Sequence, residues 1–134
     1  MQVSEGGCLC GAVRYRVSGA PLSSSICHCI TCRRASGAPT VAWVTVNRSQ
    51  LEILAGNPRA FQSSPNVVRR FCATCGSALT YENADDPKTI DITTVSLDDP
   101  NRFPPSVEVW VEHKVSWQMT DASRTQRPKG STAS

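Results

Sequence analysis

The chain has 134 residues, of which 40% are hydrophobic and 19% are charged, and its formal net charge is +3. This length suits one domain with a buried core. No apolar stretch approaches the roughly 20 residues that a membrane-spanning helix needs. Residues 1–7 lack the basic and apolar regions of a secretory signal. We therefore expect no membrane partner and a cytoplasmic protein.

The net positive charge comes from the end of the chain. Residues 122–134 contain Arg124, Arg127 and Lys129 and no acidic residue, whereas residues 1–121 carry 11 basic and 11 acidic side chains. The polar composition of the last segment predicts a disordered basic tail after a single domain at residues 1–121. A domain with equal numbers of basic and acidic side chains is not expected to present the basic face of a nucleic-acid-binding protein, so no nucleic acid is expected as a partner.

Short segments typical of β-strands follow one another along the chain. Residues 13–17 alternate apolar and polar side chains, which predicts a half-buried strand. Residues 40–46 are rich in β-branched and aromatic side chains, which predicts a strand buried on both faces. Turn signals containing Gly or Pro separate further expected strands at residues 51–54, 60–62, 67–71, 78–81, 89–95 and 107–111.

Only one segment has a helical pattern. It covers residues 30–36 and is followed by Gly37, the residue type that most often ends a helix. Many short strands with one short helix predict an all-β domain of packed sheets, with at most one or two short helical turns.

The seven cysteines are the most informative feature, because they fall into three tight clusters. The clusters are Cys8-Leu-Cys10, Cys27-His-Cys29-Ile-Thr-Cys32 and Cys72-Ala-Thr-Cys75-Gly76. A closed structural zinc site needs four protein ligands, whereas a catalytic zinc site has three and keeps one position open. Seven cysteines therefore predict one site of each kind. Disulfides are the alternative, but they are rare in a reducing compartment and would leave one thiol over.

The two cysteine pairs predict the closed site. Cys72 and Cys75 lie in a CxxC turn, and Gly76 relaxes that turn so that backbone N–H groups can point at sulfur. Cys8 and Cys10 lie two residues apart, which places both sulfurs on one face of an extended segment. Together the pairs give a four-sulfur site that joins the N-terminal part of the chain to its middle. A buried pair of free thiols is the alternative.

The middle cluster predicts the open site, since Cys27, Cys29 and Cys32 can reach one metal and no further cysteine remains. The helix N-terminus and the adjacent Arg33 and Arg34 favour thiolate over thiol. The fourth position is then open to water or to an incoming thiol.

The two histidines are weaker ligand candidates. His28 lies inside the middle cluster, but its neighbours occupy alternate positions, so its ring is expected to point away from the metal. A role for His28 as fourth ligand is the alternative. His113 follows a strand between Glu112 and Lys114 and is expected to be solvated.

The ordered motifs CxC, CHCxxCRR and RFCxxCGSxL, between Gly7 and Leu79, resemble the glutathione-dependent formaldehyde-activating enzyme family, also called the centromere protein V family. A weaker similarity continues from Val109 to Trp117. The resemblance implies a zinc-stapled, Mss4-like β fold. It also implies two zinc ions, a structural one at the four-cysteine group (Cys8, Cys10, Cys72, Cys75) and an open, labile one at the three-cysteine group (Cys27, Cys29, Cys32).

The resemblance implies a reaction as well. In this reaction the thiol of glutathione adds to formaldehyde to give S-hydroxymethylglutathione, which is a carbon–sulfur lyase running backwards. The three-cysteine group would then be catalytic. Arg33 and Arg34 are candidates to bind the carboxylates of glutathione, with a solvated helix face as the alternative. A non-catalytic zinc module that binds another protein is the competing functional hypothesis.

Overall fold

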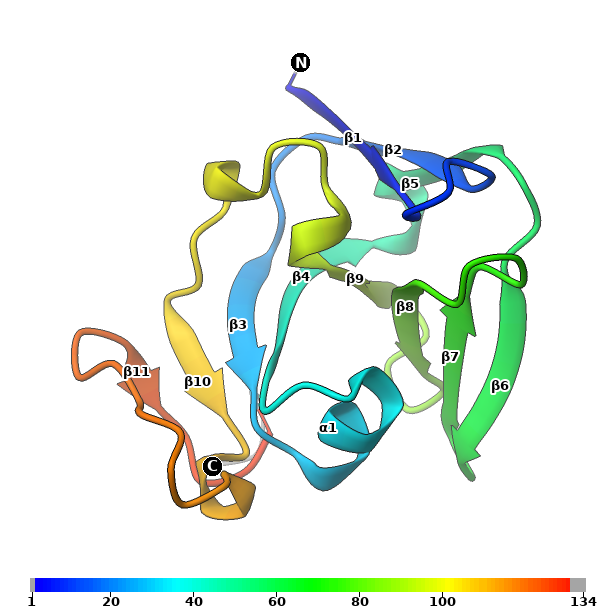
Figure 1. Cartoon of the computed structure of the whole chain (residues 1–134). Helices are drawn as coiled ribbons and strands as arrows, with labels where there is room; N and C mark the ends of the chain where they lie inside the picture. The colour runs from blue at the N-terminus through cyan, green and yellow to red at the C-terminus, as the bar shows by residue number, and fades with distance from the viewer. Residues whose placement is uncertain (1, 131–134) are drawn as a thin grey trace.

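The computed structural model describes residues 2–130 and contains two β-sheets (Figure 1). The smaller sheet has three antiparallel strands in the order β1-β2-β5. Its strands are β1 (Val3–Gly7), β2 (Arg14–Ser18) and β5 (Leu51–Ala55). It lies at one end of the molecule, and the short helix α1 (Ile30–Ser36) lies at the opposite end.

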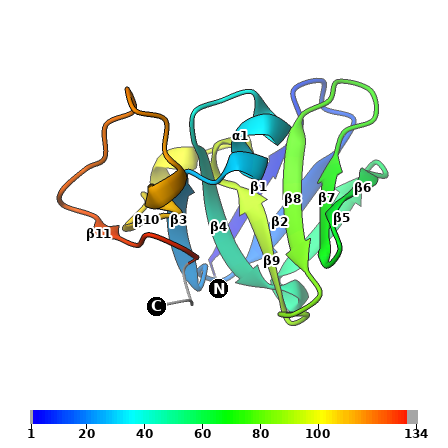
Figure 2. The same ribbon diagram turned by 90° about the horizontal axis from the view of Figure 1, so that it is seen from below.

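The larger sheet has eight strands in the order β11-β10-β3-β4-β9-β8-β7-β6. Its strands are β3 (Ser23–Cys27), β4 (Val41–Asn47), β6 (Arg59–Ser64), β7 (Val67–Phe71), β8 (Ala78–Asn83), β9 (Thr89–Thr93), β10 (Val107–Val109) and β11 (Thr125–Gln126). Neighbouring strands are antiparallel, except that β10 runs parallel to both β3 and β11. Figure 2 shows α1 beside one end of the interior strands β4 and β8 of this sheet. No helix among the described residues is long and apolar enough to cross a membrane.

The main core lies between the two sheets. The predicted alternation in β2 is confirmed, since Tyr15 and Val17 are buried while Arg14 and Arg16 are half-exposed. The buried side chains pack against Val44 and other residues of the large sheet. This packing fixes the position of the turn that carries the first two cysteines.

Strand β4 is buried on both faces, as its composition predicts. Val44 and Val46 point into the core between the sheets, and Trp43 points to the other face. Trp43 belongs there to a second buried cluster that includes Cys27 and Cys32. Strand β4 therefore forms the floor of the region in which the middle cysteines lie.

Helix α1 begins and ends where its sequence predicts. Cys29 is its N-cap, and its sulfur accepts a hydrogen bond from the Cys32 backbone N–H at 3.3 Å. Gly37 ends the helix with φ of 70°, a left-handed conformation that glycine adopts without strain.

Some elements differ from the sequence expectation. The sequence does not predict β1 or β3, because the glycines of β1 and the three serines of β3 are not typical strand residues. Both form through pairing with neighbouring strands. The expected strands at residues 89–95 and 107–111 are shorter than predicted, because Thr94–Ser96 and Val111–His113 form 3₁₀ turns. Trp110, with φ of 56°, breaks the second strand.

The expected disordered tail also differs from the structure over residues 122–130. β11 extends the large sheet, and the Trp110 and Val111 backbone N–H groups donate to carbonyls of the same segment. The basic side chain of Arg124 lies 3.4 Å from the carboxylate of Glu108, which is 1% exposed. A buried carboxylate needs such partners, and composition alone does not reveal them. Residues 131–134 lie outside the described residues, and the domain extent of 1–121 stays a prediction.

Candidate functional site

Two turns far apart in sequence bring four cysteines together. Cys8 and Cys10 lie in the turn between β1 and β2, and Cys72 and Cys75 lie in the turn between β7 and β8. Their four sulfurs lie within 4.8 Å of one another, with Sγ–Sγ distances of 3.6 Å for Cys8–Cys10 and 3.7 Å for Cys10–Cys72. Zinc–sulfur bonds of about 2.3 Å in a tetrahedron place sulfurs about 3.8 Å apart. The group therefore fits a tetrahedral metal ion.

Hydrogen bonds to two cysteines of this four-cysteine group favour their thiolate forms, which are the forms that bind metal. The Val13 backbone N–H donates to Cys8 Sγ at 3.2 Å, and this contact lowers the pKa of Cys8. Hydrogen bonds from the side chain and backbone of Ser77 lower the pKa of Cys75 to about 5. Gly76 has φ of 81°, which allows the tight turn that aims the Cys75 backbone N–H at Cys72 Sγ.

The three-cysteine group lies where β3 meets α1. Cys27 ends β3, Cys29 caps the helix and Cys32 lies inside it, and their sulfurs are within 4.8 Å of one another. Hydrogen bonds with Cys27 and Cys32, and then with the Thr31 hydroxyl, hold the pKa of Cys29 below its ordinary value. Within residues 2–130, no histidine, carboxylate or further cysteine completes the group. It could hold a metal with three protein ligands.

His28 points away from these sulfurs, as its alternating position predicts. Its ring is fully buried, and Nε2 lies 2.7 Å from Glu108 Oε1 on β10. Glu108 in turn accepts a hydrogen bond from the Asp121 backbone N–H at 2.7 Å. His28 therefore fastens the end of β3 to the C-terminal strands and is not a member of the metal-binding group.

Arg69 on β7 is a site residue that no cysteine motif of the sequence indicates. It is 9% exposed, and its two terminal nitrogens lie 3.6 and 3.7 Å from Cys32 Sγ. The guanidinium also donates to the hydroxyls of Thr31 and Ser63, each at 3.1 Å, and lies 5.0 Å from the centre of the Tyr81 ring. The sequence does place this arginine at a core-facing position of an alternating strand. A buried cation needs an anionic neighbour, so its position could have indicated a nearby thiolate or carboxylate.

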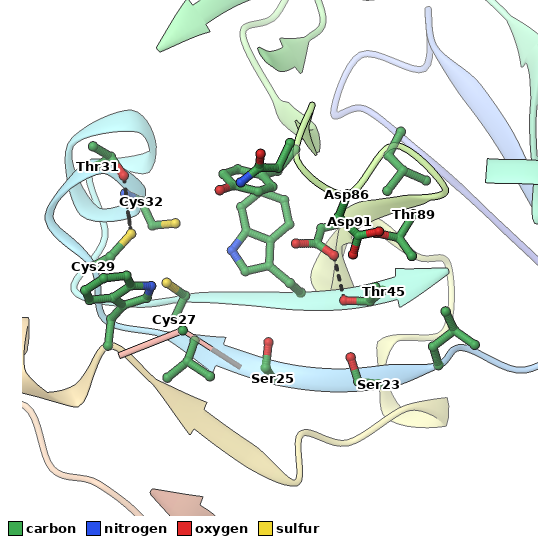
Figure 3. A pocket seen from close by; sticks show the side chains of 18 of the residues that line it. Ser23, Ser25, Cys27, Cys29, Thr31, Cys32, Thr45, Asp86, Thr89 and Asp91 are labelled. Atoms are coloured by element: carbon green, nitrogen blue, oxygen red, sulfur yellow. Dashed lines mark hydrogen bonds between the residues drawn. The ribbon is translucent and has the colours of Figure 1, made fainter. Parts of the chain in front are cut away.

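A cavity of about 810 Å³ opens beside the three-cysteine group and is called the first cavity here. Figure 3 shows Cys27, Cys29 and Cys32 at one end and Asp86, Asp91 and Thr89 at the other. Serine and threonine hydroxyls line the floor between the two ends, and Trp43, Tyr81, Trp110 and His113 complete the walls. The volume is that of a typical small-molecule site.

His113 differs from its expected solvated position. It stacks on Trp110 with ring centres 5.0 Å apart, and its side chain is 35% exposed. The left-handed backbone of Trp110 is uncommon for a bulky residue, and hydrogen bonds from residues 110–112 to the carbonyls of residues 127–129 hold it in place. Residues near the C-terminus thus position a wall of the first cavity.

Arg33 and Arg34 do not line the first cavity. Arg34 is exposed and lines a second cavity of about 540 Å³, which lies beside α1. Arg33 is half-buried, and its Nε has no hydrogen-bond partner within the described part of the chain. A substrate-binding role for these arginines stays a prediction.

Asp91 carries a pH dependence that can be tested. Burial, and then the charge of Asp86, raise its pKa to about 6, although the Thr45 hydroxyl donates to it at 2.6 Å. Its unfolded value is 3.8, so its ionisation makes folding less favourable as the pH rises from about 4 to above 6. Asp91→Asn is expected to raise the free energy of unfolding by about 1–3 kcal/mol at pH 8, with a smaller difference at pH 5.

Urea unfolding of the wild type and of Asp91→Asn, at pH 5 and at pH 8, measures this effect. Both proteins contain the same cysteines, so the difference between their free energies of unfolding cancels the pH effects on the sulfurs. An equal difference at pH 5 and pH 8 would contradict the buried-carboxylate account. A carboxylate kept at such a cost to stability is typical of a functional cavity.

The fold and the two groups define a class, namely two-sheet β proteins whose clustered cysteines could bind metal. Residues 3–113 match the family described as glutathione-dependent formaldehyde-activating enzyme. The chain belongs to this family, which confirms the resemblance seen in its cysteine motifs.

Two known proteins are similar to the chain. A Halomonas elongata protein, provisionally named a glutathione-dependent formaldehyde-activating enzyme, is 29% identical over 132 residues, which span 92% of this chain and 84% of that protein. A crystal structure of a Rhodobacter sphaeroides protein is 26% identical with a TM-score of 0.58, and covers 70% of this chain and 87% of that one. The shared fold agrees with the predicted all-β class.

Proposed function

We propose that the chain is a zinc-dependent carbon–sulfur lyase that acts on adducts of glutathione, or of a similar thiol, with small aldehydes such as formaldehyde. The observation that carries the proposal is the three-cysteine group, whose sulfurs face a cavity of small-molecule size without a fourth ligand among the described residues. Family membership supports glutathione and formaldehyde as the substrates.

Each cysteine group would have its own role. The four-cysteine group would hold a structural zinc, because it joins two distant turns and offers a complete tetrahedron of sulfurs. The three-cysteine group would hold a second, more labile zinc. Bound there, zinc would supply a Lewis acid that favours thiolate and polarises a carbonyl. The reducing cytoplasm would keep all seven cysteines free, as they are in the structure.

The reaction needs few groups from the protein. A carbon–sulfur bond forms between the thiol and the aldehyde carbon, the π bond of the carbonyl breaks as its electrons move to oxygen, and the thiol proton ends on that oxygen. The reverse reaction breaks the same carbon–sulfur bond. Arg69 lies against Cys32 and would balance the negative charge of the sulfurs. Trp43 and Trp110 would shield the reacting atoms from water.

Binding of a thiol is the first test. In protein substituted with cobalt, glutathione is expected to change the visible absorption of the three-cysteine group, because a thiolate would enter its open position. Anionic glutathione should bind more tightly than neutral 2-mercaptoethanol, by a margin that decreases with added salt. Release of free formaldehyde from S-hydroxymethylglutathione measures the reaction itself.

The competing hypothesis predicts a different result. A zinc module that only binds another protein needs no open coordination position. A cobalt spectrum that saturating glutathione leaves unchanged, with no turnover of the adduct, would favour that module over the lyase.

A further inference from the structure

A row of four residues crosses the floor of the first cavity at the end far from the cysteines. The strand register places Ser23 on β3, Thr45 on β4, Asp91 on β9 and Tyr81 on β8 directly across from one another. All four line the first cavity, so their side chains share one face of the large sheet. Figure 3 shows Asp91 at the end of the cavity opposite to the three cysteines. Its carboxylate therefore opens into the same cavity as the three-cysteine group.

Asp91 has one carboxylate oxygen available to a ligand. The Thr45 hydroxyl donates to Oδ1 at 2.6 Å, whereas Oδ2 has no hydrogen-bond or ion-pair partner within residues 2–130. Burial raises the pKa of this carboxyl group to about 6, as expected for a half-enclosed carboxylate without a cation beside it. A positively charged group of a ligand would supply the missing partner.

The charges of the cavity lining favour a cation and disfavour an anion. Asp86 also lines the far end, and over the described residues the lining includes no lysine or arginine. Asp86 and Asp91 belong to no group of three or more metal-binding side chains in the described part of the chain. Metal ions such as Ca²⁺ and Mg²⁺ need about six oxygen ligands. An organic ammonium group, which has three donors, fits this position better.

The register also gives the distance that a ligand must bridge. Cys27 lies four residues along β3 from Ser23, and Asp91 lies two strands across from Ser23. With about 3.3 Å per residue and about 4.8 Å per strand, the Cα atoms of Cys27 and Asp91 are roughly 16 Å apart. Two metal–sulfur bonds and a final hydrogen bond take up about 7 Å of this distance. A substrate therefore needs about 10 Å between its sulfur and its cationic group.

We propose that Asp91 binds an ammonium group of the thiol substrate, and that the substrate class is a thiol with this group about 10 Å from its sulfur and no carboxylate beside it. This inference rests on the proposed function, because it assumes that the substrate sulfur binds at the three-cysteine group. It also goes further, since glutathione carries a carboxylate on the same carbon as its ammonium group. Asp86 and Asp91 would repel that carboxylate.

Two synthetic thiols that differ only at the far end test the proposal. 4-Aminobutyryl-cysteinylglycine has an ammonium group eight bonds, or about 10 Å, from its sulfur, and pentanoyl-cysteinylglycine has a methyl group in its place. Protein substituted with cobalt is expected to bind the amine roughly tenfold more tightly at pH 8, because a charge-assisted pair forms. Glutathione, with its additional carboxylate, should bind about threefold more weakly than the amine.

Three variants assign the preference to a residue. Asp91→Asn is expected to remove the preference for the amine while the protein stays folded, since the same substitution should stabilise the fold. Glu52→Gln is the matched control, because it removes an exposed carboxylate from β5, outside both cavities, and should keep the full preference. If Asp86→Asn removes the preference and Asp91→Asn does not, the assignment to Asp91 is wrong.

The preference should also depend on pH. The ammonium pair needs ionised Asp91, so the preference should decrease to roughly threefold at pH 5.5, which lies below the pKa of about 6. Asp86 and Tyr81 are the other titratable groups that face Asp91, and burial raises the pKa of Tyr81 above its ordinary value of 10, so Tyr81 stays neutral in this range. The ratio of the two affinities cancels pH effects on the metal and the sulfurs. An equal ratio at both pH values would overturn the role of Asp91.

The outcomes separate the two proposals. If both thiols change the cobalt spectrum with equal affinity, or if Asp91→Asn keeps the full preference, the ammonium site is wrong while the lyase proposal stands. Glutathione that binds as tightly as the amine would contradict the exclusion of a neighbouring carboxylate. The S-methyl derivatives of both synthetic thiols, which have no free thiol, are measured by calorimetry on the zinc protein. If no thiol changes the spectrum but the S-methyl amine is still preferred through Asp91, the lyase proposal falls and the ammonium site stands.

Discussion

A Cys75→Ser variant is expected to lose its cooperative fold. The four-cysteine group ties the turn between β1 and β2 to the turn between β7 and β8, and Cys8 and Cys72 are part of the main core. The apparent binding energy of structural zinc in small domains is about 10–16 kcal/mol. Total domain stability is about 5–15 kcal/mol, so loss of one ligand is enough to unfold the chain. Circular dichroism during heating, together with zinc content, measures the effect.

Cys29→Ser is the matched control, because it removes one sulfur from the three-cysteine group. Those three ligands close only a short loop between β3 and α1, so the variant is expected to keep its fold and the zinc of the four-cysteine group. The zinc of the three-cysteine group should be lost or weakened. A soluble, cooperatively melting Cys75→Ser protein with full zinc content would contradict the assignment, as would equal damage from both substitutions.

The division of the cysteines was predictable because it depends on ligand number and spacing. A zinc site needs three or four donors, and these donors must lie within a few ångströms of one another. Only one division of the three cysteine clusters into two sites gives each site three or four sulfurs. The structure brings together the same two groups. The end of α1 at Gly37 was predictable for a similar reason, because a left-handed C-terminal position favours glycine.

Features fixed by distant partners were not predictable. The serines of β3 form a strand because β4 and β10 pair with it on either side, and local propensity says nothing of those neighbours. Residues 122–130 have a composition typical of disorder, yet they are ordered by Glu108 and by the edge of β10.

The arginines illustrate the same limit. Arg33 and Arg34 adjoin the three-cysteine group in sequence, but helix geometry turns Arg34 into the second cavity. Arg69, which is 37 residues from Cys32, is the cation that contacts its sulfur.

Replacing Arg69 by Met is expected to weaken metal binding at the three-cysteine group by roughly 10- to 100-fold, the usual cost of losing a residue that supports a metal ligand. Three thiols that bind Zn²⁺ release three protons, so the group changes from neutral to a net charge of −1. The guanidinium 3.6 Å from Cys32 Sγ stabilises that anion. Addition of a substrate thiolate makes the group more negative still, so glutathione affinity should fall further. Zinc transfer to a chelator and the cobalt titration measure the two effects.

A purely structural role for Arg69 predicts a different pattern. Its hydrogen bonds to Thr31 and Ser63 also hold α1 against β7, so loss of packing alone would lower the melting temperature without a selective loss of metal. Arg69→Lys restores the charge without the fork of donors and should recover part of the zinc affinity. Arg48→Met, which removes an exposed arginine outside both cavities, should retain both metals. If Arg69→Met melts early but holds the second zinc as tightly as the wild type, Arg69 supports the helix and not the metal.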